Sequence, residues 1–124
     1  PDGDTGIVLI LFLPDPEITG KFAEALKAEG IAASSMHNKS VPDWHVYSHW
    51  DMILNKWTAT QEGCPYTCPH YLNKGGNVQY SSDMNPNTLN YLRRSLHIDI
   101  PAQMTGDDCD MISEGILKVA KAYL

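Results

Sequence analysis

Apolar residues in the first third of the chain follow the pattern of a strand and then that of a helix. Residues 7–13 form a continuous apolar run between a glycine and a proline, which predicts a strand covered on both faces. Asp15-Pro16 is typical of a helix start, because Asp caps the first turn and Pro lacks an N–H that would be unpaired there. Residues 31–36 predict a second, weaker strand after Gly30, which suits a helix end. The helix between them has an apolar stripe made of Ile18, Phe22, Ala25 and Leu26.

The middle of the chain keeps this regularity at first and then loses it. Apolar residues at helical spacing predict a helix over residues 43–58, with a buried face of Val46, Trp50, Ile53, Leu54 and Trp57. From residue 61 to 87 no periodicity remains, and glycines and prolines stand among polar residues and tyrosines. A stretch of this length without structure is uncommon in a compact domain, so we interpret 61–87 as a functional or mobile loop. Residues 87–93 predict a short helix.

The last third of the chain is regular again. Apolar and polar residues alternate over 96–100, which predicts a strand whose outward residues, His97 and Asp99, are solvated. Thr105 precedes Asp108 by three residues, a capping-box spacing that predicts the start of a final helix. One face of that helix is apolar and is predicted to be buried: Cys109, Ile112, Ile116, Val119 and Tyr123. Gly115 in its interior costs about 1 kcal/mol relative to alanine, which predicts close packing at that point.

Together these elements predict one α+β domain over residues 1–124, with a small, mainly antiparallel sheet covered by helices on one face. The net charge of −6 argues against a nucleic-acid surface, which needs clustered Lys and Arg. The longest apolar run is much shorter than the roughly 20 residues of a membrane span. Three cysteines, an odd number, suggest reduced thiols and a cytoplasmic location.

Cysteine and histidine residues near the middle of the chain raise the question of a zinc site. Cys64, Cys68 and His70 are ligand types that zinc prefers. A closed structural site needs four ligands, however, and the third cysteine, Cys109, is predicted to lie on the last helix. This favours a proline-stiffened loop that packs small thiols over a metal centre.

Histidines, arginines and tyrosines are the other candidate binding groups. On the predicted helix His45 and His49 share a face, where they are either ordinary surface residues or ligands for sugar hydroxyls or phosphate. Arg93 and Arg94 could bind a carboxylate, but the excess of acidic residues favours a solvated pair. Tyrosines in and around the loop suit sugar or interface contacts, or fix the loop to the domain: Tyr66, Tyr71, Tyr80 and Tyr91. The sequence contains neither a glycine-rich phosphate loop nor a recognisable nucleophile elbow.

Several segments, in order, resemble the small C-terminal domain of the DegT-type sugar aminotransferases, which are fold-type I enzymes that depend on pyridoxal phosphate (PLP). Residues 6–13 are similar to the family's entering strand, and 18–31 to its helix that ends in Gly-Ile. Met36-His37 stands near a histidine common in that family. Ser95-Leu-His-Ile98 and Met104-Thr-Gly-Asp-Asp-Cys-Asp110 are similar to the last strand and the start of the last helix. The resemblance covers nearly the whole chain.

The chain also departs from this family. Its strand proline is His97 here, and Ser34-Ser-Met-His-Asn-Lys39 replaces the usual Tyr-Pro-x-Pro-Leu-His segment. Residues 45–56 and 64–71 look closest to a branch that aminates keto-sugars of the octulosonate type.

The resemblance implies an aminotransferase that moves an amino group from glutamate or another amino acid to a keto-sugar, nucleotide-linked or octulosonate-type. It places the Schiff-base lysine and most of the pyridoxal 5'-phosphate site in a large domain outside this chain, so no catalytic residue is assigned here. The chain would then supply a wall of the substrate cleft and part of a homodimer contact, and would be inactive alone. The implied substrate-binding candidates are His37, His45, His49, His70 and Tyr71.

Three other interpretations remain open. A PLP-dependent sugar dehydratase shares the fold and can lack the lysine, which the chain cannot reveal. A stand-alone module could use the aromatic loop to bind a carbohydrate or a protein. A metal-stabilised module would depend on Cys64, Cys68 and His70 alone.

Overall fold

The chain folds into two compact units, and the residues of one unit interrupt the sequence of the other. The structure is a computed structural model that describes residues 5–35 and 42–124. The sheet unit consists of Pro1–Lys39 and Asn87–Leu124, and the inserted unit consists of Ser40–Pro86. We describe each unit by itself.

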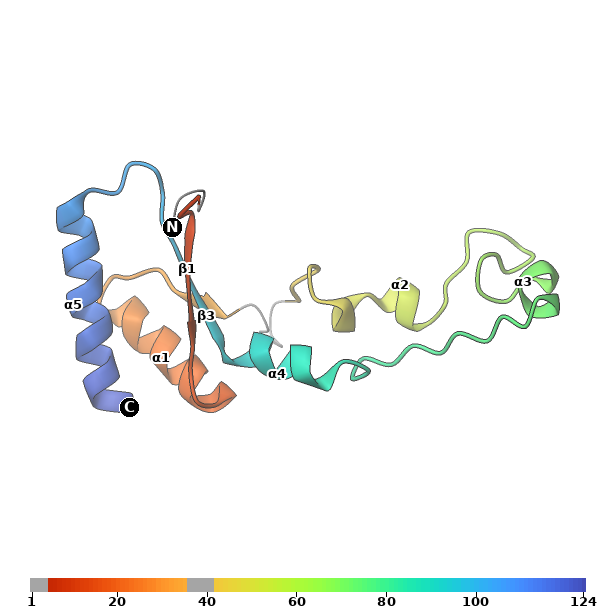
Figure 1. Cartoon of the computed structure of the whole chain (residues 1–124), viewed down its shortest axis with the longest axis horizontal. Helices are drawn as coiled ribbons and strands as arrows, with labels where there is room; N and C mark the ends of the chain where they lie inside the picture. The colour runs from red at the N-terminus through yellow and green to blue at the C-terminus, as the bar shows by residue number, and fades with distance from the viewer. Residues whose placement is uncertain (1–4, 36–41) are drawn as a thin grey trace. The chain divides into compact units, whose positions relative to one another are not determined.

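The sheet unit is built on three antiparallel strands, β1 (Val8–Phe12), β2 (Ser34–Ser35) and β3 (Ser95–Asp99). Their order is β1-β3-β2, so the strand that comes last in the sequence lies in the centre. Helices α1 (Pro16–Ala28) and α5 (Gly106–Tyr123) pack on one face of the sheet (Figure 1). The third helix of this unit, α4 (Pro86–Arg94), runs directly into β3. The α+β class and the one-sided helical cover predicted from the sequence are thereby confirmed.

Helix α1 begins and ends as its sequence predicts. The Asp15 side chain accepts the backbone N–H of Ile18 at 2.8 Å, and Pro16 occupies the first turn. Gly30 has φ +85° just after the helix, a conformation that glycine adopts without the strain of a side chain. The Ile31 N–H then returns to the carbonyl of Leu26 at 2.9 Å, which closes the C-terminus.

The core of the sheet unit lies between this sheet and the two helices. Leu26 of α1 and Leu96 of β3 are completely buried, and Ile98 of β3 is nearly so. Burial of a side chain of this size contributes roughly 1.5–3 kcal/mol relative to exposure. The core cluster consists of Leu13, Phe22, Ala23, Leu26, Ile31, Ala33, Leu96, Ile98 and Val119.

Helix α5 has the predicted capping box and the predicted close contact. The Thr105 backbone N–H donates to the Asp108 carboxylate at 2.8 Å, and the Asp108 N–H donates to the Thr105 hydroxyl at 3.3 Å. A Cβ added at Gly115 would overlap the terminal methyl group of Ile31, so the glycine allows Ile31 to pack closely against α5. The predicted buried face is too long, because Cys109 at its start is exposed and Tyr123 at its end is 39% exposed.

The expectation that both faces of the first strand are covered is wrong. β1 is an edge strand, and α1 and α5 cover the face that carries Leu11. The opposite face, which we call the outer sheet face, consists of Val8, Ile10 and Phe12 together with their partners on β3 and β2. On this face Tyr91 of α4 lies edge-on against Phe12, with ring centroids 5.9 Å apart. Ile10 is 42% exposed and Phe12 is 60% exposed. The apolar run therefore gives the chain an exposed apolar strand face.

The inserted unit does not contain the helix predicted over residues 43–58. It forms instead the 3₁₀ turn η1 (Tyr47–His49) and the single-turn helix α2 (Asp51–Leu54). Its first backbone bonds span three residues, as in turns and 3₁₀ helices: the Val46 N–H donates to the Asp43 carbonyl and the His49 N–H to the Val46 carbonyl, each at 3.0 Å. At Trp50 ψ is 71°, which separates the two short elements.

The segment interpreted as a loop, 61–87, is more ordered than its composition suggested. It contains the short helix α3 (Pro69–Asn73) and a turn in which the Thr67 N–H donates to the Gly63 carbonyl at 2.7 Å. The predicted helix at its end is confirmed as α4, which starts at Pro86. None of the helices formed by residues 5–35 and 42–124 has both the length and the apolar content needed to cross a membrane.

Candidate functional site

Two of the predicted site histidines meet at Asp43, although no common helix carries them. The His45 Nδ1 lies 2.8 Å from the Asp43 carboxylate, and the His49 Nδ1 lies 2.8 Å from the Asp43 carbonyl oxygen. Because both oxygens are acceptors, each Nδ1 must carry the hydrogen. The third candidate, His37, lies outside the described residues.

Hydrogen bonds to Asp43 also set its charge. The pKa of its carboxyl is lowered, first by the hydrogen bond from the His45 backbone N–H and then by that from the His45 imidazole. Asp43 is thus ionised at neutral pH and fixes the tautomer of His45. The His45 side chain is 89% exposed, so its Nε2 is presented outward as a hydrogen-bond acceptor. This pair can bind a hydroxyl group, or an anion when the imidazole is protonated.

The other two predicted site residues are neighbours on α3. His70 is exposed, whereas Tyr71 is half-buried and holds the following segment in place. Its hydroxyl oxygen accepts the backbone N–H of Val78 at 3.0 Å, and its ring lies against Gly76, where an added Cβ would overlap it. Tyr71 therefore holds together two parts of the segment 61–87 itself.

Other tyrosines of the inserted unit act in the same way. The Tyr47 hydroxyl accepts the Asn85 N–H at 2.9 Å, and the rings of Tyr66 and Tyr80 meet edge to face with centroids 6.1 Å apart. These contacts provide part of the order of a segment that has little apolar core.

The two cysteines of the inserted unit lie four residues apart, Cys64 within and Cys68 directly after the turn closed by the Thr67 N–H and the Gly63 carbonyl. Cys64 is half-buried and Cys68 is 3% exposed. The thiol of Cys64 donates to the sulfur of Cys68, which raises the pKa of Cys64 and lowers that of Cys68. Backbone N–H groups of Tyr71 and His70 lower the pKa of Cys68 further. Within residues 5–35 and 42–124, no three His, Cys, Asp or Glu side chains are placed so that they could hold a metal ion.

A hollow in the inserted unit, lined mainly by tryptophan, was missed by the sequence analysis. We call it the tryptophan hollow; it has a volume of about 690 Å³ and is lined by Trp44, Trp50, Asp51, Met52, Ile53 and Trp57. Trp44 is 65% exposed and Trp57 is 62% exposed. The Trp50 indole N–H donates to the Trp44 carbonyl, which orients that ring. The predicted helix would have buried Trp50 and Trp57, and its interruption leaves them at the surface.

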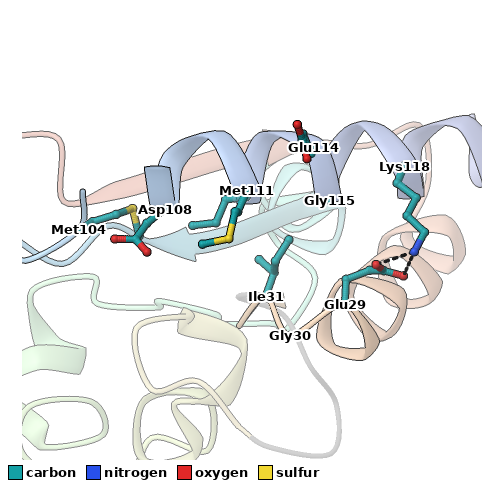
Figure 2. A pocket seen from close by; sticks show the side chains of 10 residues that line it. Glu29, Gly30, Ile31, Met104, Asp108, Met111, Glu114, Gly115 and Lys118 are labelled. Carbon is teal, nitrogen blue, oxygen red and sulfur yellow. Dashed lines mark hydrogen bonds and ion pairs between the residues drawn. The ribbon is translucent and has the colours of Figure 1, made fainter. Parts of the chain in front are cut away.

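The groove in the sheet unit has a structural explanation. It holds about 500 Å³ between the end of α1 and α5 (Figure 2). Most of its charged groups already have partners: Lys118 donates to both carboxylate oxygens of Glu29 at 2.8 and 2.7 Å, and Asp108 belongs to the capping box. Its floor is the contact between Ile31 and Gly115.

Two residues that were predicted to be solvated, Arg94 and His97, are partly buried in the sheet unit. The Arg94 guanidinium donates to the Leu13 carbonyl at 3.0 Å and lies 5.4 Å from the centre of the Tyr91 ring. The Nε2 of His97 is buried and has no hydrogen-bond partner among the described residues. Both predictions are therefore wrong: Arg94 is held by Leu13 and Tyr91, and the Nε2 of His97 is shielded from solvent.

Three of the described lysines form ion pairs at the surface of the sheet unit: Lys21 with Glu17, Lys27 with Glu24 and Lys118 with Glu29. No family model, curated protein or solved structure matches the chain.

Proposed function

We propose that the chain is the small domain of a PLP-dependent aminotransferase that acts on a keto-sugar. The order of the sequence segments that resemble this family supports the proposal, as does the α+β fold with helices on one face. The observation that carries most weight is the outer sheet face. Val8, Ile10 and Phe12 form an apolar stripe on an edge strand, beside polar partners on β3 and β2. Ile10 is 42% exposed and Phe12, which also contacts Tyr91, is 60% exposed, and this exposed stripe supports a surface that another domain covers.

In this proposal the covering domain is the large domain of the same enzyme. That domain holds the cofactor, which serves as the electron sink when bound. The contribution of the present chain is to bind the sugar. His45 is the best-placed candidate, because Asp43 fixes its tautomer and leaves Nε2 free to accept a hydrogen bond from a sugar hydroxyl.

The cofactor part of the proposal is tested on the full-length enzyme by absorbance. A PLP–lysine Schiff base gives a visible band that disappears on borohydride reduction. A full-length protein without this band, even after incubation with PLP, would overturn the aminotransferase proposal.

The substrate part is tested with three replacements of His45. The Gln amide lies near the position of the imidazole Nε2, whereas the Asn amide lies near Nδ1. We expect His45→Ala and His45→Asn to raise KM for the sugar about 10- to 100-fold, the equivalent of a hydrogen bond worth roughly 1.5–3 kcal/mol. His45→Gln should retain most of the affinity, and all three should leave the cofactor band unchanged. Equal kinetics in all three variants would remove His45 from the sugar site.

The tryptophan hollow favours a second candidate function, that of a carbohydrate-binding module. Flat indole rings with exposed faces suit the apolar faces of sugar rings, and Asp51 at the edge can accept hydroxyl hydrogens. Titration with keto- and aldo-sugars in the absence of PLP should then change the tryptophan fluorescence. The change should be lost in Trp57→Ala and kept in Trp57→Phe, which retains an aromatic ring.

A further inference from the structure

The tryptophan hollow combines exposed indole faces with a carboxylate. Asp51 is the only charged residue among the described residues that line it, and its carboxylate forms no ion pair or hydrogen bond with them. Trp44 and Trp57 are largely exposed, and no Lys or Arg of residues 5–35 and 42–124 lies over either ring. Because the face of an indole ring carries partial negative charge, the lining of the hollow is negative as a whole.

The sheet unit contains the same pairing of ring and cation in a completed form. There the Arg94 guanidinium lies 5.4 Å from the centre of the Tyr91 ring, so a cation of the protein occupies the aromatic face. In the inserted unit Lys56 precedes Trp57, but its ammonium group donates to the Gln79 side chain at 3.2 Å and it is not a lining residue. The described part of the chain thus supplies no cation to the hollow.

We propose that the tryptophan hollow binds a small organic cation whose nitrogen is fully alkylated, that is, a quaternary ammonium ion. Such an ion is attracted to indole faces and to a carboxylate. It has no N–H group that needs an acceptor, and its methyl groups suit the apolar side chains of Met52 and Ile53. A primary ammonium ion is more strongly hydrated, and one carboxylate does not replace its water.

The size and polarity of the hollow agree with this ligand. Its volume of about 690 Å³ lies within the range of roughly 300–1,000 Å³ that is usual for small-molecule sites. The indole N–H of Trp50 already donates to the Trp44 carbonyl, so this ring offers its apolar face rather than a donor. A sugar has several hydroxyl groups that need partners, whereas a quaternary ammonium ion has none. The hollow therefore suits the cation better, whether or not the chain belongs to an aminotransferase.

A charged ligand and an uncharged ligand of the same shape test the proposal on the unaltered chain. Choline and 3,3-dimethylbutanol differ only in a positive nitrogen that replaces a carbon atom. Tryptophan fluorescence is titrated with each at constant, low ionic strength. We expect a saturable change with choline and binding of the isostere that is about 10-fold weaker. Equal affinities would overturn the proposal, because the hollow would then be only apolar. The absence of saturation with choline, or tighter binding of a neutral sugar, would also overturn it.

Replacements at the lining then locate the site. Asp51→Asn keeps the side-chain size and should raise the Kd for choline about 2- to 5-fold without affecting the isostere. Asp110→Asn removes the same charge from an exposed position of α5 and should change neither affinity. Trp57→Leu, which keeps an apolar side chain, should reduce the preference for choline, and Trp57→Phe should retain part of it.

An unchanged choline affinity in both Asp51→Asn and Trp57→Leu would exclude the hollow as the site and overturn the proposal. The comparison of choline with its isostere needs no variant, so it stands even if a replacement prevents folding.

Discussion

Replacing Gly115 with alanine is expected to destabilise the sheet unit, although alanine is the better helix former. Glycine in a helix interior costs about 1 kcal/mol relative to alanine, so propensity alone predicts a gain of that size. The new Cβ, however, would lie well inside the roughly 3.5–4.0 Å contact distance of two carbon atoms from the Cδ1 of Ile31. Ile31 is 9% exposed and belongs to the core.

The balance of these two effects can be estimated. Overpacking a core by one methyl group costs about 1–3 kcal/mol. The groove beside Ile31 offers its ethyl end some room to move, so we take the middle of this range (Figure 2). Subtracting the helical gain leaves Gly115→Ala destabilised by about 1 kcal/mol.

A second replacement tests the cause directly. Ile31→Val removes Cδ1 and should itself cost about 0.5–1.5 kcal/mol. The next Ile31 atom is Cγ1, which lies 3.7 Å from the added Cβ and is in ordinary contact. In the Ile31→Val background Gly115→Ala should therefore stabilise by about 1 kcal/mol, which gives a coupling energy of roughly 2 kcal/mol.

Gly20 provides the matched control for this cycle. It also lies inside a helix, α1, but a Cβ added there would meet no atom within 4 Å. Gly20→Ala should stabilise by about 1 kcal/mol in either background. Urea denaturation followed by circular dichroism gives the free energies of unfolding. If Gly115→Ala changes the free energy of unfolding equally in the unaltered chain and in the Ile31→Val background, the contact with the Ile31 Cδ1 is not the cause of the destabilisation. The prediction is then wrong.

Four other variants have expected outcomes. Thr105→Ala should lower the free energy of unfolding by about 1 kcal/mol, because the N-cap of α5 is lost; an unchanged urea midpoint would contradict the cap. The pKa of Asp108 is lowered by hydrogen bonds from the side chain and backbone of Thr105, so its stabilisation is present above its unfolded pKa of about 4 and is lost as the pH falls through the lower folded value. Thermal midpoints of the unaltered protein and Asp108→Asn should differ at pH 7 and converge in strong acid. Gly76→Ala should accelerate limited proteolysis of the inserted unit, because the added Cβ overlaps the ring of Tyr71, while Tyr71→Phe, which loses only a hydrogen bond, should have a smaller effect.

The elements predicted correctly are those whose signals are local. Asp15 and Gly30 define the ends of α1, and Thr105 with Asp108 defines the start of α5, because each acts on backbone groups within a few residues. The strand over 96–100 was also predicted correctly, because the alternation of apolar and polar residues is a local pattern. The prediction of a helix over 43–58 is wrong, because three-residue backbone bonds form turns over 43–50 and the backbone at Trp50, with ψ 71°, interrupts the apolar spacing.

Candidate site residues were predicted less well, because their positions depend on distant contacts. His45 and His49 meet at Asp43 through turns that periodicity does not encode. Arg94 reaches the carbonyl of Leu13, a residue far away in the sequence. The tryptophan hollow could have been suspected from three tryptophans within residues 44–57, but their exposure follows only from the interrupted helix.

The central position of β3 has a consequence for how the protein is made. Val8 pairs with Asp99 and Phe12 pairs with Ser95, so β1 has no partner until the inserted unit has been synthesised. At roughly 5–20 residues per second, this delay is about 4–17 s. During that interval an apolar strand is exposed on the nascent chain, which makes it a natural binding site for ribosome-associated chaperones. Codon changes that slow translation across the insertion should therefore lower the soluble yield without altering a single amino acid.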